Sequence, residues 1–385
     1  MNKIARTRAQ SLIKLGMAGV LLTAVSTSVL SQRGAVQPEA HALQQPVNNL
    51  PNPYETQRNF GSLPDGRSWG SVSAVDIDVD GIHVWAGDRC GANSCATSSV
   101  DPILKLDPTG QVVTAFGADQ IIWPHGMDVD QQGNVWVADA RLANERELQE
   151  NPAARNRGSA VLKFSPTGEL LMTLGTPGEM GDPPTHFTEP NDVLVAPSGR
   201  IFVVETHGAQ FQDEPGPNSK SRLTLWEPDG TFIKTVGEWG FEDGQFRSPH
   251  SLAMDSQGRL FVADRGNNRI QIFTQDGDHL DTWYQFSRIS GLHIDPVTDL
   301  LYAIDSESDP NYNPGGWRKG LRVGDARTGE VLYFIPEHVS PERSSGMGGV
   351  GSMGEGVTSD SNGVVYAGEV GPIQGMTKFI PRLIP

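Results

Sequence analysis

The chain has 385 residues and a formal net charge of −16, with 46 acidic against 30 basic side chains. This balance argues against a nucleic-acid partner, because a surface that binds nucleic acid needs clustered Lys and Arg to neutralise phosphates. The 44 Gly and 27 Pro residues argue against a helical bundle, since both disfavour helix interiors. Hydrophobic residues make up 37% of the chain and charged residues 20%, which is enough apolar material for a sizeable core.

The first 30 residues have the layout of a secretory signal. Four basic residues open it: Lys3, Arg6, Arg8 and Lys14. An apolar run from Leu15 to Leu30 follows, which predicts export to the periplasm or the cell exterior. The run is short for a membrane span, so we expect no stable span after processing, with an uncleaved anchor as the alternative. Residues 31–60 are rich in Pro, Gln and Asn without an apolar period and predict a linker.

Beyond residue 60, one unit recurs six times. The units open at Ser73, His125, Asn191, His250, Ser290 and Glu355. Each begins with alternating apolar and polar residues, turns at a polar, usually Gly-bearing step, and enters a second strand rich in Val, Tyr, Phe or Trp, which predicts a β-hairpin. Third and fourth strands follow. Six repeats of four antiparallel strands predict an all-β fold, a six-bladed β-propeller over residues 61–385. A β-sandwich is the alternative, disfavoured by the sixfold recurrence.

Several repeats contain distinctive sequence stretches. The sharpest stretches are GDRCGANSC (residues 87–95), WPHGMDVDQQGNVWVAD (123–139), FRSPHSLAMDSQGRLFVADRGNNRIQIF (246–273) and MGEGVTSDSNGVVYAGE (353–369). These stretches resemble the repeats of NHL-repeat propellers. From Val84 to Phe379 the sequence resembles the peptidyl-α-hydroxyglycine α-amidating lyase family. The resemblance implies a six-bladed propeller that holds zinc in its central channel on three His residues, with a Tyr and Arg residues acting on the substrate.

Two of the zinc ligands of that family match His125 and His250. Both stand eight residues before a turn glycine, Gly133 and Gly258 respectively. Equivalent positions on the innermost strands of different blades point towards the common axis, so these imidazoles can converge there. Imidazole nitrogen suits zinc, and three protein ligands with one open position are usual in catalytic sites. The alternative is that each His merely caps a strand.

The third ligand position departs from the family. It holds Glu355, eight residues before Gly363, where the family has His followed by Asp. A carboxylate can ligate zinc beside two His residues, and it also favours harder metals such as iron, manganese or calcium. The alternative is a solvated channel carboxylate. Gly356 replaces the Asp of the family's structural calcium site, which argues against calcium here.

The family's catalytic Tyr falls at His207. Its imidazole can accept a hydroxyl proton at neutral pH more readily than a phenol, because the unperturbed pKa is about 6.5 rather than about 10. The alternative is a loop His bonded to its neighbours. Arg265 matches the family's Arg in the PHSLA blade. The first-blade Arg position holds Ala86, with Arg89 three residues on as the substitute.

Guanidinium groups beside a metal channel suit a substrate carboxylate, so Arg89 and Arg265 are predicted to bind one. Ordinary inter-blade ion pairs with Asp88, Asp139 or Asp264 are the alternative. Cys90 and Cys95 are the two cysteines and predict a local disulfide in an exported chain, with half of a metal site as the weaker alternative.

The signal layout and the family resemblance together favour an exported, metal-dependent lyase, which we expect to be a monomer. It would cleave the carbon–nitrogen bond of a small-molecule or peptide carbinolamide to give an amide and glyoxylate. Two further classes stay open: a metal-dependent lactone or ester hydrolase, and an NHL scaffold that binds without chemistry.

Overall fold

The computed structural model describes residues 44–211, 214–216, 219–310, 312–337, 353–371 and 374–382. The chain divides into two units, residues 1–33 and 34–385, and every described residue belongs to the second. The predicted signal, residues 1–30, lies outside the described residues. No helix among the described residues is long and apolar enough to cross a membrane.

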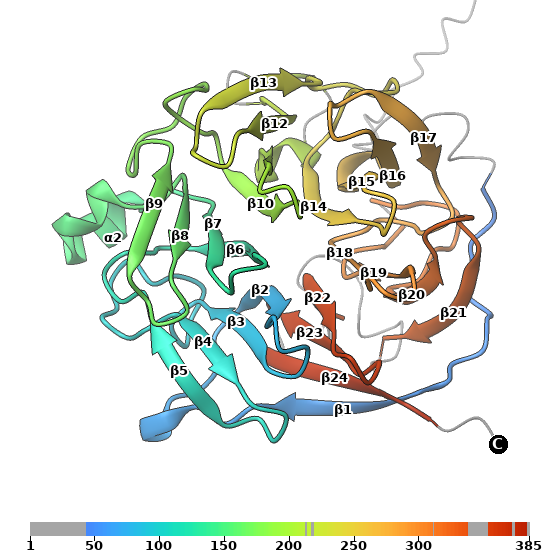
Figure 1. Ribbon diagram of the computed structural model, residues 1–385, viewed down its shortest axis with the longest axis horizontal. Helices are drawn as coiled ribbons and strands as arrows, with labels where there is room; N and C mark the ends of the chain where they lie inside the picture. Colours follow the sequence, from blue (N-terminus) through green and yellow to red (C-terminus); the bar gives the residue numbers. More distant parts are fainter. Residues whose placement is uncertain are drawn as a thin grey trace, which may run out of the picture. The chain divides into compact units, whose positions relative to one another are not determined.

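Six four-stranded antiparallel sheets form the described unit, which confirms the six-bladed β-propeller (Figure 1). Blade 1 contains β2 (Val72–Ile77), β3 (Val84–Asp88), β4 (Ile103–Leu106) and β5 (Val112–Phe116); blade 2 contains β6 (Pro124–Val129), β7 (Val135–Asp139), β8 (Ala160–Phe164) and β9 (Leu170–Leu174). Blade 3 contains β10 (Pro190–Val195), β11 (Ile201–Glu205), β12 (Arg222–Trp226) and β13 (Phe232–Val236); blade 4 contains β14 (Pro249–Met254), β15 (Leu260–Asp264), β16 (Arg269–Phe273) and β17 (His279–Trp283).

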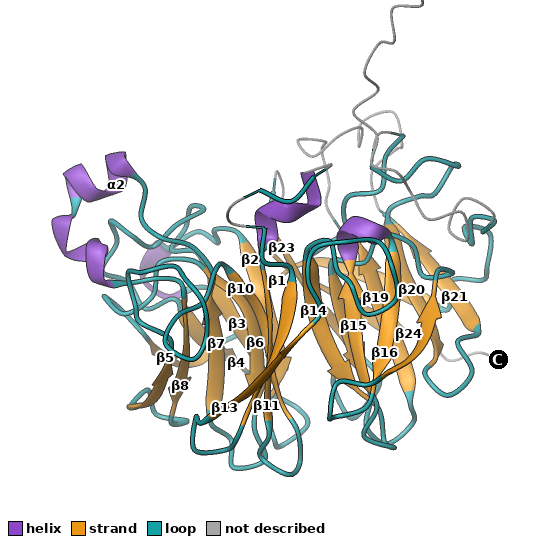
Figure 2. Ribbon diagram, turned by 90° about the horizontal axis from the view of Figure 1, so that it is seen from above, coloured by secondary structure: helices purple, strands orange, loops and turns teal. Residues whose placement is uncertain are grey.

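Blade 5 contains β18 (Gly291–Ile294), β19 (Leu300–Asp305), β20 (Gly320–Asp325) and β21 (Val331–Pro336); blade 6 contains β22 (Gly356–Ser359), β23 (Val365–Glu369), β24 (Gly375–Pro381) and β1 (Tyr54–Phe60). Short helices interrupt the loops of the described chain: η1 (Pro64–Gly66), α2 (Glu145–Glu150), η2 (Pro152–Asn156), η3 (His207–Phe211) and η4 (Arg265–Asn267). Figure 2 shows α2 at one end of the strands.

The sixth blade corrects the predicted linker. Residues 54–60, expected within it, form β1 and pair antiparallel with β24. The strand escapes notice in the sequence because only its end residues, Tyr54 and Phe60, are buried. The first described strand thus completes the blade built from the last three, which joins the two ends of the propeller through backbone hydrogen bonds.

Hydrophobic clusters fill the space between neighbouring blades. One cluster joins Trp85 and Phe116 of blade 1 to Val135 and Phe164 of blade 2. The next joins Trp136 of blade 2 to blade 3. Fully burying one such large side chain contributes about 1.5–3 kcal/mol, and each blade buries both faces in this way. This inter-blade packing fixes the radial positions of the innermost strands.

A belt of polar side chains links the innermost strands around the axis. Its members are Asp76, Asp128, Asp192, Ser251, His293, Thr358 and Ser359, and we call them the inter-blade belt. The side-chain oxygens of the first four accept backbone N–H groups of the next blade, from Val129 (2.8 Å), Val195 (3.1 Å), Leu252 (2.8 Å) and Leu292 (3.1 Å) respectively. Nε2 of His293 lies 3.0 Å from Oγ of Ser359, and the hydroxyl of Thr358 donates to Oδ1 of Asp76 (3.2 Å). Every blade contributes, so the belt closes.

Candidate metal centre

The innermost strands begin, and the second strands end, at the same end of each blade, because the two pair antiparallel. His125 and His250 lie at the start of β6 and β14, and Glu355 directly precedes β22. His207 and Arg265 follow β11 and β15. The topology therefore brings all five residues to one end of the central channel.

Three imidazoles meet there. The ring centroids of His125 and His250 are 4.6 Å apart. The ring centroid of His207 lies 5.1 Å from that of His125 and 5.4 Å from that of His250. One nitrogen of each ring lies within 4.8 Å of the other two, and no other such group of three or more His, Cys, Asp or Glu occurs among the described residues. The predicted convergence of His125 and His250 is present, and His207 joins it.

Backbone carbonyl groups orient two of these rings. Nδ1 of His125 donates to the carbonyl oxygen of Asn191 (2.7 Å), and Nδ1 of His250 donates to that of Ser290 (2.6 Å). A carbonyl oxygen can only accept, so Nδ1 carries the hydrogen and Nε2 carries the lone pair. Both Nε2 atoms are buried without a hydrogen-bond partner among the described residues. Metal-ligating His residues commonly show this arrangement.

The environment keeps these imidazoles neutral. Burial lowers the pKa of His125 and of His250 well below the usual value, and neighbouring His and Arg side chains lower it further. Burial also lowers the pKa of His207 well below the usual value, and the Arg265 guanidinium lowers it further. Neutral imidazole is the form that can ligate a metal or accept a proton. The cluster thus presents lone pairs rather than charges.

Glu355 lies beside the group of three imidazoles without being one of its members. Its Oε2 lies 3.9 Å from Nε2 of His125, and its Oε1 accepts from Nη1 of Arg265 (3.4 Å). Burial raises the pKa of Glu355, which Arg265 and Arg89 partly counteract. The carboxylate therefore lies within reach of a cation at the imidazoles, although it is already shared with an arginine.

Arg265 is fully buried and lies between several partners. Its Nη2 donates to Nε2 of His207 (3.2 Å), which makes Nε2 the acceptor nitrogen of that ring. Its Nη1 also lies 3.7 Å from Glu307. Asp264, the alternative partner considered from the sequence, instead accepts from Arg269 (2.8 Å). Arg265 is thus directed towards the His cluster.

Arg89 lies at the edge of the same group. Its guanidinium carbon is 3.7 Å from the centroid of the Trp123 ring, and Trp123 in turn packs edge-on against His207. Nη2 donates to Ser73 (2.6 Å) and Nε to the carbonyl of Pro124 (3.2 Å). Burial lowers the pKa of Arg89 to about 9. Asp88 pairs with Arg67 instead. The Cys90–Cys95 disulfide, which confirms the predicted pairing, closes the loop that follows Arg89.

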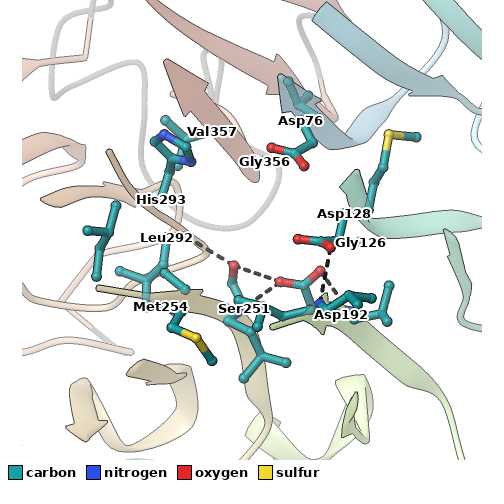
Figure 3. A pocket seen from close by; sticks show the side chains of 18 of the residues that line it. Asp76, Gly126, Asp128, Asp192, Ser251, Met254, Leu292, His293, Gly356 and Val357 are labelled. Atoms are coloured by element: carbon teal, nitrogen blue, oxygen red, sulfur yellow. Dashed lines mark hydrogen bonds between the residues drawn. The ribbon is translucent and has the colours of Figure 1, made fainter. Parts of the chain in front are cut away.

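A cavity of about 700 Å³ leads from the imidazoles along the channel. His125, His250 and Glu355 line one part of it, and apolar side chains such as Leu194, Leu292 and Val357 line another. Figure 3 shows belt residues of the same cavity, with Ser251 bonded to Asp192. His125, His250 and Glu355 are therefore open to a ligand of small-molecule size, whereas His207, Arg265 and Arg89 do not line this cavity.

The sequence pattern does not mark two side chains that lie beside Arg265. Glu307 and Arg288 contact each other (3.2 Å) next to Arg265. Glu307 lies in the insertion after β19, and Arg288 lies between blades 4 and 5, where no repeat pattern marks a position. Trp123 was visible as the aromatic residue two positions before His125, but its contact with Arg89 depends on the fold.

Comparisons with known proteins agree with the repeat pattern. The NHL repeat family matches residues 246–273. Peptidyl-glycine alpha-amidating monooxygenase B of Xenopus laevis is 36% identical over 346 residues, covering 81% of this chain and 34% of that protein. NHL repeat-containing protein 3 of Homo sapiens is 39% identical over 220 residues, covering 56% of this chain and 55% of that protein.

Peptidyl-alpha-hydroxyglycine alpha-amidating lyase 2 of Drosophila melanogaster is 21% identical over 276 residues, covering 63% of this chain and 61% of that protein. The chain spans about a third of the length of the two Xenopus laevis monooxygenases that it matches. Among solved structures, a gluconolactonase from Xanthomonas campestris superposes with a TM-score of 0.50 at 15% identity, covering 87% of this chain and 99% of that one. This last likeness concerns the fold alone.

Proposed function

We propose that this chain, an NHL-repeat six-bladed propeller that resembles the peptidyl-α-hydroxyglycine α-amidating lyases, is a metal-dependent carbon–nitrogen lyase. Its substrate is a carbinolamide that carries a carboxylate, and its products are an amide and glyoxylate. One observation carries the proposal: the buried Nε2 atoms of His125 and His250 have no hydrogen-bond partner in the described part of the chain, and each ring is fixed by a backbone carbonyl through its Nδ1 hydrogen.

The residues present fit a divalent metal such as zinc. Two neutral imidazoles and the Glu355 carboxylate form a two-His, one-carboxylate set, which is common for catalytic zinc. A bound cation supplies Lewis acidity, which makes a contacting hydroxyl group more acidic. The buried Nε2 atoms support this assignment, because leaving such groups without any partner is costly.

His207 serves as the base. It removes the proton of the substrate hydroxyl, a carbonyl forms at that carbon, and the carbon–nitrogen bond breaks with its electron pair moving to nitrogen. The proton held by His207 then returns to that nitrogen, which leaves as a neutral amide. In the resting protein Nε2 of His207 accepts a hydrogen from Arg265, so it is unprotonated, and this contact has to break when Nε2 takes the substrate proton.

Arg265 and Arg89 bind the substrate carboxylate. Arg265 lies against His207 and Glu355, and Arg89 lies behind Trp123, so both guanidinium groups border the reacting centre. A charge-assisted contact to a carboxylate contributes about 1.5–3 kcal/mol, enough to favour α-hydroxyglycine compounds over analogues without the acid.

We expect no calcium ion at Gly356. A Cβ built there would lie 2.1 Å from the carbonyl oxygen of Ser73, so β22 and β2 approach too closely for an Asp side chain at this position.

We also propose that the chain acts as an exported monomer. The Cys90–Cys95 disulfide supports export, because disulfides persist in oxidising compartments.

A glyoxylate-release assay tests the proposal. Purified, metal-loaded protein is incubated with an N-acyl-α-hydroxyglycine, and both the amide and glyoxylate are quantified. Equal amounts of the two products, lost on chelation and restored by metal, are expected. The same protein is tested with lactones and esters. Hydrolysis of these without any glyoxylate release would instead support the hydrolase, and inactivity in both assays would leave only a binding scaffold.

A further inference from the structure

Arg288 connects three loops that surround the candidate centre. It lies between β17 and β18 and is 1% exposed. Its Nη1 donates to the backbone carbonyl of Arg265 (3.0 Å), in η4 of blade 4. Its Nη2 donates to Oε1 of Gln210, in η3 of blade 3, and to Oε2 of Glu307 (3.2 Å), in the loop after β19 of blade 5. One side chain therefore links loops of three successive blades.

These links hold the segments that carry the proposed base and carboxylate ligand. Gln210 lies in the same short helix as His207, three residues further along the chain. The carbonyl that Arg288 holds belongs to Arg265 itself. Since a buried guanidinium can donate several hydrogen bonds in a fixed plane, it constrains both segments at once.

Glu307 balances the charge of this arrangement. Its Oε2 lies 3.2 Å from Arg288 and 3.7 Å from Arg265. Burial alone would raise the pKa of Glu307, but the two guanidinium groups lower it below its usual value. The carboxylate thus separates two like charges that would otherwise repel each other in a water-poor environment.

We infer that Arg288 is a positioning residue, which holds the loops of His207 and Arg265 in the relative arrangement that the proposed lyase reaction requires. The inference rests on the proposed function for its catalytic consequence. Arg288 acts through Gln210 and the backbone of Arg265, and it contacts neither of the imidazoles of His125 and His250 in the described structure.

The test compares Arg288→Met with Arg157→Met. Arg157 is also a buried arginine, 6% exposed, but its contacts are with the carbonyl of Ala96 and the carboxylate of Asp119, in loops that follow strands of blade 1. Hydrogen exchange measured by mass spectrometry reports the two segments directly. Arg288→Met should speed exchange in residues 207–211 and 265–268, whereas Arg157→Met should not.

Kinetics give the catalytic consequence. Arg288→Met should lower kcat by about tenfold to a hundredfold, since small displacements of reacting groups have effects of this size. KM should change less, because Arg288 contacts the backbone carbonyl of Arg265 and not the guanidinium group that is proposed to bind the carboxylate. Gln210→Leu should lower kcat as well, and the double variant should be no slower than Arg288→Met alone, because both changes break the same link.

Unchanged exchange in both segments, or equal effects of the two Met variants, would overturn the inference. Additive effects of Arg288→Met and Gln210→Leu on kcat would also contradict it. If the parent protein releases no glyoxylate, the proposed function fails, but the exchange measurement still decides whether Arg288 positions the two loops. A circular-dichroism melt of each variant identifies any general loss of folding.

Discussion

His125 and His250 occupy equivalent positions in alternate blades, and their ring centroids are 4.6 Å apart. Each ring donates its Nδ1 hydrogen to the residue at the same repeat position in the following blade, Asn191 and Ser290 respectively. Repetition of the blade thus supplies both the ligand and the group that orients it. The two lone pairs face a shared space because the propeller closes around them.

His207→Ala is expected to abolish most of the activity while leaving the metal bound. Loss of a general base typically lowers kcat by about a hundredfold to ten-thousandfold, and His207 is the proposed base. Glyoxylate release and metal content are measured on the same sample. His186→Ala, a change at a partly exposed His between β9 and β10, serves as the control. Loss of the metal in His207→Ala would reassign His207 as the third ligand.

Glu355→Gln is expected to weaken metal binding by at least about tenfold, because removal of supporting groups at metal sites already has effects of this size. Calorimetry, recorded while the metal-free protein is titrated with zinc, gives the affinity for zinc. Glu307→Gln is the matched control, since Glu307 also faces Arg265 but pairs with Arg288, whereas Glu355 lies beside His125. Equal zinc affinity in parent and Glu355→Gln would show that the carboxylate serves Arg265 alone.

Arg265→Met is expected to raise KM for a substrate with a free carboxylate by about tenfold to a hundredfold, the value of one or two charge-assisted hydrogen bonds. The methyl ester of the same substrate should show a much smaller change. Steady-state kinetics on both compounds measure the difference, with Arg265→Lys separating loss of charge from loss of the planar donor group. A parallel rise for acid and ester would contradict carboxylate binding.

Asp128→Asn is expected to raise the melting temperature at pH 8. Burial, and then the charge of Asp76, raises the pKa of Asp128 well above its usual value. Burial similarly raises the pKa of Asp76 and of Asp192 to about 7. An Asn side chain keeps an oxygen that can accept the Val195 N–H group without adding a buried charge.

The sign of the pH effect follows from these shifts. A folded-state pKa above the unfolded value means that the folded protein binds more protons, so stability falls as pH rises from about 4 towards about 7. The advantage of Asp128→Asn should therefore shrink at pH 5. Asp229→Asn, at an exposed turn, is the control. If Asp128→Asn instead lowered the melting temperature equally at both pH values, the ionised carboxylate of Asp128 would be the form that stabilises the folded protein.

The repeat pattern predicted the architecture because each blade is specified locally. Alternating residues, a polar turn and a second apolar strand identify a hairpin without reference to its neighbours. The same phase argument placed His125, His250 and Glu355 at one end of the channel, since antiparallel pairing fixes which strand ends meet. The Cys90–Cys95 pair needed only its short separation.

Other features depend on long-range packing and could not be predicted. β1 forms only because β24 offers a free edge. The contact between His207 and Arg265 joins loops of two blades, and the links of Arg288 join three. The belt position of Asp128 is visible as an inward strand residue, but its raised pKa arises from burial beside other carboxylates.

Elemental analysis of the native protein and of the His125→Ala/His250→Ala variant tests the central assignment most directly. About one divalent metal ion per chain is expected in the parent protein, and none in the variant, whose fold is checked by circular dichroism. A parent protein that holds no metal after purification and zinc incubation, or a variant with unchanged metal content, would contradict a cation shared by these two imidazoles.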